Sequence, residues 1–294
     1  MFEKALFPVD FSEISDKVLA CTSALEGLGI RKAVLLHVTD VRSAVDFLGF
    51  DKTFYERHDQ MATQELAARL ENLRRAGIEA ESRLVHDIPG KGVVHAARAE
   101  GCDIVVMGSH GRTSWKEKLL GGTTGFVVEH ADVPVLVMRP AGTGDRFTCA
   151  LEARPVTDHV CLLTDLSPRA EGARRAARSL APRAARMTLF HVVESPGAGE
   201  ETARETPPGK APAAARNRLA GLAEEMKAAG AGAVEVELVT GPVREEVTRR
   251  LRRGDVTLAV MGTRGWGGFR ELLLGSVSRA AVEFAAAPIL LVRE

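Results

Sequence analysis

Two glycine-containing loops are the residues of this sequence best suited to chemistry. Each loop follows a short apolar run and has the spacing G-x2-G-x9-G, through Gly108, Gly111 and Gly121 in the first half of the chain and Gly262, Gly265 and Gly275 in the second. A buried strand that ends in glycine, followed by a helix that opens on glycine and a hydroxyl, offers backbone N–H groups to a phosphate. A single loop of this kind is often only a tight turn, but the repeated spacing favours a phosphate site.

Other side chains at predicted strand ends extend this site. Asp10 and Asp165 end the first strand of each half, and Val38 and Val192 end the second. A carboxylate can accept a hydrogen bond from a ribose hydroxyl, and the hydroxyl of Ser276 can donate one to a phosphate oxygen. Together these groups indicate a mononucleotide site. The alternative interpretation is that both aspartates are simple helix caps.

The two halves differ where the last helix begins. Ser276 directly follows the third glycine in the second half, whereas the first half has Gly122 there and Thr123 one step later. One step along a helix turns a side chain by about 100°, so Thr123 need not replace the missing hydroxyl. The first site is therefore expected to be the weaker. Arg112 and Arg264, beside the second glycines, either pair with phosphate or are solvated.

Several catalytic motifs are missing from the sequence. It contains no G-x4-G-K-[ST], no G-x-G-x-x-G after a first strand and no G-x-S-x-G. The histidines are scattered singly, and the four cysteines form no CxxC. We therefore predict no catalytic residues and no metal ligands, and a site that holds its ligand rather than turning it over. The cysteines are expected to be free thiols in a reducing cytosol.

An internal repeat decides the domain organisation. Gly108 and Gly262 are 154 residues apart (262 − 108), and the same offset relates Pro134 to Pro288. It also relates His37-Val38 to His191-Val192. The chain therefore reads as a tandem duplication. We predict a first domain over residues 1–140, a linker over 141–156 and a second domain over 157–294.

Each half alternates strands and helices. Apolar runs predict strands over 4–9, 33–38, 78–85, 103–107 and 135–138, and again over 159–164, 187–192, 234–239, 256–261 and 289–292. Helical spacing predicts helices over 14–26, 56–75, 92–100 and 122–130, and over 169–180, 213–229, 243–253 and 276–285. Five continuous apolar strands separated by helices indicate a parallel sheet covered on both faces. Ligands of such sheets bind beyond the carboxyl ends of the strands.

Composition narrows the class of protein. The chain has 294 residues, a length that fits about two domains, and its 39 basic residues balance its 39 acidic ones. Zero formal charge argues against a nucleic-acid partner. No apolar run approaches the roughly 20 residues that span a bilayer, and no signal peptide is recognisable. We expect a cytoplasmic protein without a membrane partner.

Short segments in both halves carry a resemblance to a known family. They are residues 8–12, 36–38, 107–112 and 133–137, and residues 164–165, 191–192, 261–265, 274–276 and 288–292. With these segments the sequence resembles the universal stress protein family in its tandem two-domain form, over nearly the whole chain. ATP-binding members of that family are marked by G-x2-G-x9-G-[ST], which the second half satisfies fully.

The resemblance implies two tandem open-sheet α/β domains of the adenine nucleotide alpha hydrolase-like type. Each would hold ATP, AMP or ADP at the carboxyl edge of its sheet, with Mg²⁺ left open as a companion of the nucleotide. Family members also pair through their last strands, which implies an intramolecular pseudo-dimer through Val135–Met138 and Ile289–Val292. A homodimer of whole chains stays an open alternative.

The resemblance also assigns nucleotide-binding positions. In the first half they are Pro8, Val9, Asp10, Val38, Met107, Gly108, Gly111, Arg112, Gly121, Gly122 and Thr123. In the second half they are Thr164, Asp165, Val192, Met261, Gly262, Arg264, Gly265, Gly275, Ser276 and Val277. The function expected from them is an adenine-nucleotide-binding stress-response or signalling protein. The alternatives are a partner-binding scaffold with vestigial pockets and a slow ATPase.

Overall fold

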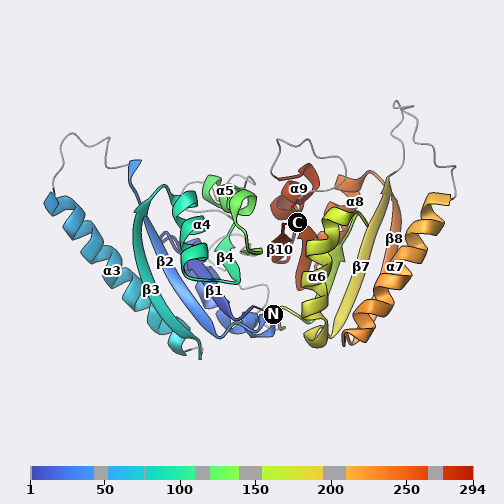
Figure 1. Cartoon of the computed structure of the whole chain (residues 1–294), viewed down its shortest axis with the longest axis horizontal. Coiled ribbons are helices and arrows are strands. Elements are labelled where there is room, and N and C mark those ends of the chain that lie inside the picture. The colour runs from blue at the N-terminus through green and yellow to red at the C-terminus, as the bar shows by residue number, and fades with distance from the viewer. Residues whose placement is uncertain are drawn as a thin grey trace. The chain divides into compact units, whose positions relative to one another are not determined.

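The computed structural model describes residues 2–42, 52–75, 77–109, 120–138, 154–194, 210–263 and 274–293. The chain divides into two compact units, residues 2–153 and 154–294 (Figure 1). Four of the predicted site residues, Gly111, Arg112, Arg264 and Gly265, lie outside the described residues. Most of the predicted linker 141–156 lies outside them too, so the domain boundaries stay a prediction.

The first unit is built on a parallel five-stranded sheet in the order β3-β2-β1-β4-β5. Its strands are β1 (Lys4–Pro8), β2 (Lys32–Asp40), β3 (Glu79–Asp87), β4 (Ile104–Gly108) and β5 (Val135–Met138). Its helices are α1 (Glu13–Ala20), α3 (Lys52–Arg75), α4 (Pro89–Ala99) and α5 (Gly122–His130). α1 contacts α3, and α4 contacts α5. β2 and β3 follow on one side of β1, whereas β4 and β5 lie on its other side. Right-handed crossovers therefore place α1 and α3 on one face of the sheet and α4 and α5 on the other.

The second unit repeats this arrangement, with the strand order β8-β7-β6-β9-β10. Its strands are β6 (His159–Leu163), β7 (Arg186–Glu194), β8 (Ala233–Gly241), β9 (Leu258–Gly262) and β10 (Ile289–Val292). Its helices are α6 (Glu171–Leu180), α7 (Lys210–Ala228), α8 (Val243–Leu251) and α9 (Ser276–Phe284). The predicted fold of two five-stranded parallel sheets with helices on both faces is confirmed. How the units pair stays a prediction.

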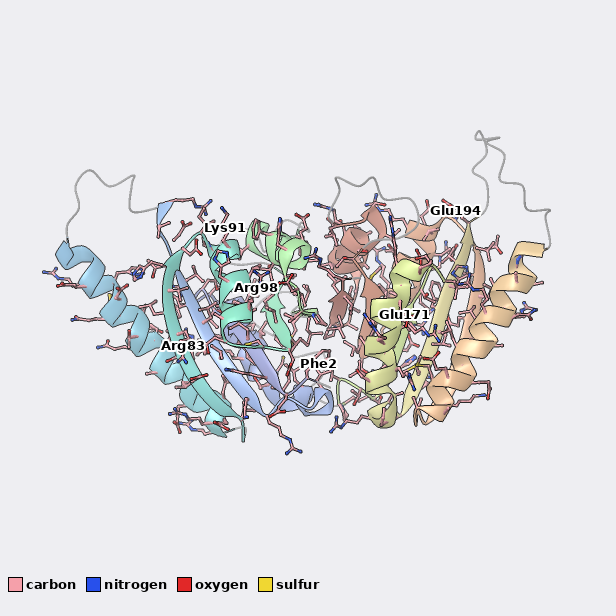
Figure 2. The ribbon with its side chains drawn as sticks, in the orientation of Figure 1. Phe2, Arg83, Lys91, Arg98, Glu171 and Glu194 are labelled. Atoms are coloured by element: carbon pink, nitrogen blue, oxygen red, sulfur yellow. The ribbon has the colours of Figure 1, made fainter. Side chains whose placement is uncertain are left out.

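The central strands form the core of each unit. Leu6 of β1 lies beside Val105 of β4, and both side chains are fully buried. Cys161 and Ala259 occupy the matching places in the second unit and are fully buried as well. Strands buried on both faces explain the continuous apolar runs in the sequence. Charged side chains instead lie on the outer faces, as Glu171 does on α6 (Figure 2).

The predicted end of the first helix is corrected. The helix predicted over 14–26 ends at Ala20, and a 3-10 helix follows it over Thr22–Leu28. The buried residues Thr22, Leu25 and Leu28 recur every three positions, which suits the three residues per turn of a 3-10 helix.

The free-thiol prediction for the cysteines is confirmed for Cys102 and Cys161 but is wrong for Cys21, which is disulfide-bonded.

Close packing fixes the first helix of the second unit against its last strand. A Cβ added at Gly172 of α6 would lie 2.3 Å from the carbonyl oxygen of Arg293, just after β10. No larger residue fits at that distance without a shift of the backbone. The small side chain at this position therefore lets the helix approach the sheet.

A buried ionic cluster lies at the edge of the second sheet where β6 and β7 begin, that is, at the amino ends of the strands. Arg250 is 1% exposed and donates to both carboxylate oxygens of Asp255, at 2.8 and 3.1 Å. His159 is also 1% exposed, with Nδ1 2.8 Å from Nη2 of Arg186 and Nε2 2.8 Å from the hydroxyl of Thr188. Burial lowers the pKa of His159, and Arg186 adds to this against the opposing effect of the Asp255 carbonyl. The cluster lies away from the strand ends at which ligands bind.

Candidate functional site

The ends of the first two strands are locked together in both units. In the first, the N–H of Val9 donates to the carbonyl of Leu36 at 2.8 Å, and Nδ1 of His37 donates to the carbonyl of Val9 at 2.8 Å. In the second, Nδ1 of His191 donates to the carbonyl of Thr164 at the same distance. A carbonyl only accepts, so Nδ1 carries the proton in both rings. The two histidines thereby hold the turns that carry the predicted aspartates.

Each predicted aspartate organises the turn that follows its strand. Oδ1 of Asp10 accepts the backbone N–H of Ser12 at 3.0 Å, and Oδ1 of Asp165 accepts that of Ser167 at 2.9 Å. The residues between them, Phe11 and Leu166, both have φ of 59°, which is uncommon for a side chain with a Cβ. Strain of this kind persists where the surroundings over-determine the backbone, often at ligand sites.

The helix-cap alternative for Asp10 is answered by the geometry of this turn. The residue that caps α1 is Ser12, whose hydroxyl accepts the N–H of Ser15 at 3.3 Å. Asp10 lies two residues earlier and uses one carboxylate oxygen to shape the turn. The carboxylates of both units therefore lie at the carboxyl edge of the sheet without capping the helix directly.

The predicted valines lie within the second strands rather than at their ends. β2 continues to Asp40 and β7 to Glu194, because the neighbouring strand pairs with them in register to the last residue. Val38 packs tightly on α4, since a Cβ at Gly92 would lie 2.8 Å from its Cγ1. Val192 is buried. The valines form part of the wall beside the strand-end turns.

A set of hydrogen bonds closes the glycine loop of the first unit. Gly108 is the last residue of β4, and the next N–H, of Ser109, donates to the carbonyl of Met138 at 3.0 Å. The N–H of Gly121 donates back to the carbonyl of Ser109 at 3.0 Å. The hydroxyl of Thr124, 3% exposed, donates to the carbonyl of Gly108 at 2.9 Å. The strand end and the start of α5 are thereby tied together.

The second unit repeats these bonds at the matching positions. Thr263 donates through its N–H to Val292 at 3.1 Å, and Gly275 donates to the carbonyl of Thr263 at 2.9 Å. The hydroxyl of Ser278, 3% exposed, donates to the carbonyl of Gly262 at 3.0 Å. Thr124 and Ser278 are not among the predicted site residues, although both halves have a hydroxyl residue three positions after the third glycine, which is a signal visible in the sequence.

The helices that follow the loops begin with backbone donors facing the edge. α5 begins at Gly122 after Gly121, and α9 begins at Ser276 after Gly275. Neither helix has a side-chain cap among the described residues, and neither has an acidic residue in its first turn. The first N–H groups of a helix have no partner within the helix, so an anion can bind there. Ser276 is exposed at this point.

The described site residues therefore gather at one edge of each sheet. Pro8 ends β1 and Val9 directly follows it, the buried Met107 precedes Gly108 at the end of β4, and the start of α5 comes next along the chain. Thr123 is exposed one position after Gly122. Within the described ranges, no three His, Cys, Asp or Glu side chains come together in a way that could hold a metal.

The comparisons with known proteins agree with the architecture. Residues 1–139 and 157–293 each match the profile of the Universal stress protein family. Universal stress protein MJ0577 of Methanocaldococcus jannaschii is 33% identical over 155 residues, which cover 47% of this chain and 96% of that relative. A universal stress protein of Mycobacterium tuberculosis is 27% identical over 223 residues, 74% of this chain and 70% of the relative.

A solved structure extends the likeness over both units. A universal stress protein from Archaeoglobus fulgidus covers 99% of this chain and 96% of its own, with a TM-score of 0.73 at 22% identity. At that identity the likeness shows the fold. Among the described residues, no helix is long and apolar enough to cross a membrane.

Proposed function

The chain belongs to the universal stress protein family, and on that premise we propose that it is a stress-response or signalling protein that binds adenine nucleotide, ATP or AMP. One observation carries the proposal. α9 begins at the exposed Ser276 and has no side-chain cap among the described residues. This helix start lies next to the glycine turn that follows β9. Backbone donors, the positive end of a helix and a hydroxyl together suit a phosphate chain.

The rest of the same edge suits the adenosine. The turn at Thr164 and Asp165 follows β6, which lies beside β9 and its glycine turn in the sheet. A carboxylate there can accept a hydrogen bond from a ribose hydroxyl, and the buried Val192 offers apolar surface on the next strand. Mg²⁺ accompanying the nucleotide would be bound through the phosphate oxygens.

The site is proposed to hold nucleotide rather than to turn it over quickly. His37 of β2 and His191 of β7 each donate the Nδ1 proton to a backbone carbonyl and thereby hold the turn after the first strand of their unit. The aspartates each spend an oxygen on their own turn. Slow ATP hydrolysis remains the alternative at this site, and turnover measured over hours would distinguish it from binding alone.

Three further parts of the proposal concern the whole chain. We propose that the units pair through Val135–Met138 and Ile289–Val292, because pairing would cover two exposed sheet edges. A cytoplasmic location and the absence of a nucleic-acid partner rest on the sequence composition. A partner-binding scaffold is the competing function, and it predicts no nucleotide in the purified protein.

The first test is the nucleotide content of the protein as purified, measured by mass spectrometry, together with calorimetric titration with ATP. The variant Ser276→Asp places a negative charge where the phosphates are expected. An acidic residue at a helix start stabilises the helix by about 0.3–1 kcal/mol, so lost binding could not be ascribed to unfolding. ATP affinity at the second site is expected to fall by at least about tenfold.

The matched control is Asn217→Asp, which adds the same charge on the exposed surface of α7. It should leave ATP affinity unchanged. Equal affinity in Ser276→Asp and the native chain would contradict the phosphate assignment. Purified protein free of nucleotide and showing no ATP binding at millimolar concentration would favour the scaffold.

A further inference from the structure

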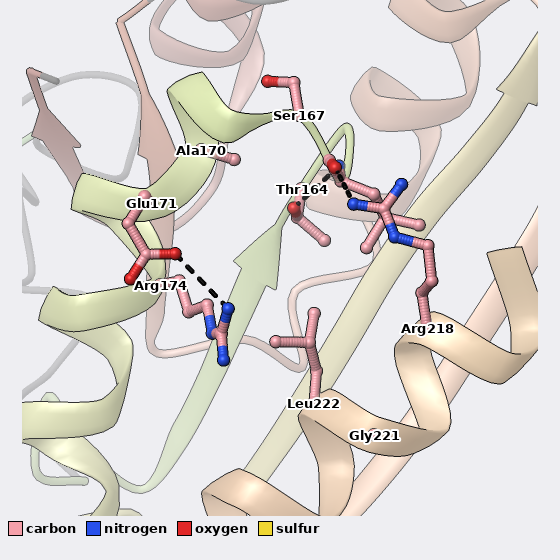
Figure 3. A pocket seen from close by; sticks show the side chains of 9 residues that line it. Thr164, Ser167, Ala170, Glu171, Arg174, Arg218, Gly221 and Leu222 are labelled. Atoms are coloured by element: carbon pink, nitrogen blue, oxygen red, sulfur yellow. Dashed lines mark hydrogen bonds and ion pairs between the residues drawn. The ribbon is translucent and has the colours of Figure 1, made fainter.

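The second unit contains a cavity of about 390 Å³ between α6, α7 and the turn after β6 (Figure 3). Thr164, Leu166 and Ser167 of the turn form one wall, and Arg218 and Leu222 of α7 form another. Pockets for small ligands commonly measure about 300–1,000 Å³. The cavity is therefore large enough for a small organic molecule.

The first unit fills the corresponding place with its own side chains. Phe11, the counterpart of Leu166 by position and by its φ of 59°, stacks on His37 with ring centroids 4.1 Å apart. The guanidinium of Arg69 lies 5.0 Å from the centre of the Phe11 ring. In the second unit a leucine replaces the phenylalanine, and Leu222 stands where Arg69 would be. The stack is lost and its volume is left open.

The correspondence between α3 and α7 follows from their buried positions. Leu66 and Leu219 are both buried and are 153 residues apart (219 − 66). The same offset relates Arg69 to Leu222 and Glu65 to Arg218. The two units therefore place different side chains at equivalent positions of equivalent helices. The size and shape of those side chains decide whether the space between the helix and the turn is filled or left as a cavity.

The polar groups of the cavity are mostly hydrogen-bond donors. Arg218 bonds through Nη2 to the carbonyl of Leu166, and no described carboxylate pairs with it (Figure 3). The hydroxyl of Thr164 accepts the N–H of Leu166 at 3.0 Å, which leaves its own proton to donate. The Ser167 hydroxyl is buried without a partner among the described residues and points away from Arg218 (Figure 3).

The other arginine of the cavity, Arg174, is already paired with carboxylates. Nε of Arg174 donates to Glu225 at 2.8 Å, and Nη1 lies 3.3 Å from a carboxylate oxygen of Glu171. These ion pairs raise the pKa of Arg174, mainly through the hydrogen bond that its guanidinium donates to Glu225. Arg218 is thus the cation left to meet a ligand, with apolar surface from Leu222 beside it.

We propose that this cavity binds a small organic anion, a carboxylate or phosphate monoester joined to an apolar body. The anionic group would meet Arg218 and the hydroxyl of Thr164, and the apolar body would pack on Leu166 and Leu222. The site is distinct from the phosphate site proposed at Ser276, because the cavity lies between α6 and α7 whereas α9 packs with α8. The two sites share the turn at Thr164.

The test uses the full chain and three probes: benzoate, phenyl phosphate and the neutral benzyl alcohol. Binding is followed by ligand-observed NMR and calorimetry, with and without saturating ATP. We expect at least one anion to bind saturably in both conditions, and benzyl alcohol to bind at least about tenfold more weakly, since a hydrogen bond to a charged group is worth that factor. Which anion binds better identifies the carboxylate or the phosphate as the natural group.

Two variants locate the site. Leu166→Phe introduces the residue of the first unit and should abolish anion binding by filling the cavity. Arg218→Gln should weaken it by about tenfold or more, whereas Arg216→Gln, two positions earlier and therefore turned by about 200°, should leave it unchanged. Thermal unfolding checks that each variant is folded. If Leu166→Phe does not fold, the comparison of the two arginine variants decides.

The proposal is overturned if neither anion binds, if benzyl alcohol binds equally well, or if Leu166→Phe binds the anions as the native chain does. Equal weakening by Arg218→Gln and Arg216→Gln would also overturn it. Competition between ATP and the anions would show that the cavity is part of the nucleotide site, which contradicts the proposal. If ATP does not bind but the anions do, the inference still holds, because anion binding is measured separately from ATP binding.

Discussion

Gly122 is the position at which the first site can be given the hydroxyl that the second site has. It begins α5 as Ser276 begins α9, and a Cβ added there would have no heavy atom within 4 Å. The substitution Gly122→Ser therefore meets no steric obstacle. If phosphates bind at these helix starts, the new hydroxyl should strengthen ATP binding in the first unit.

The size of the effect follows from the environment of the position. A hydrogen bond to a charged group contributes about 1.5–3 kcal/mol, and Gly122 is exposed, which favours the lower end. About 1.4 kcal/mol corresponds to a tenfold change in affinity. Serine is also about 0.5 kcal/mol better than glycine within a helix, so folding stability should not fall. The expected result is ATP binding about tenfold tighter in the first unit.

The assay is calorimetric titration with ATP in a chain that also carries Ser276→Asp, which weakens the second site so that a change at the first site can be measured. Gly122→Ala is the matched control, because it adds the Cβ and the helix propensity without the hydroxyl. Its affinity should stay at the native value. If Gly122→Ser and Gly122→Ala bind ATP equally, the hydroxyl has no phosphate partner and the proposed position of the phosphates is refuted.

Three further predictions concern the stability of the second unit. Gly172→Ala should lower the free energy of unfolding by about 1–3 kcal/mol through overlap with the end of β10, whereas Gly221→Ala, with open space around it, should not; denaturant unfolding compares them. Arg250→Ala should cost about 3 kcal/mol in the same assay, because Asp255 loses its buried partner. Because burial lowers the folded-state pKa of His159, the unfolded chain binds the proton first, and stability should fall as pH drops below about 6.5. Thermal unfolding between pH 7.5 and 5.5 checks this, and an unchanged slope in His159→Gln would contradict it.

The sequence by itself determined the duplication and the fold class, and it predicted the edge of the sheet at which the proposed site lies. Continuous apolar runs such as Ile104–Met107, bounded by glycine, indicate strands buried on both faces, and the glycine that follows marks where such a strand turns. These are local signals, because the side chains and backbone freedom that produce them belong to neighbouring residues. The loss of a hydroxyl at Gly122 could likewise be read directly from the two aligned halves.

Only the tertiary structure decided how distant residues meet. The bond from Thr124 to the carbonyl of Gly108 depends on where α5 lies relative to β4, and no local pattern fixes that. The cavity beside Leu166 depends on the side chains of a helix some 50 residues away, since Phe11 and Arg69 fill the same place in the first unit. Sequence patterns record which faces are buried, but the volume left between two packed elements is set by the side chains of both, and these come together only in the folded chain.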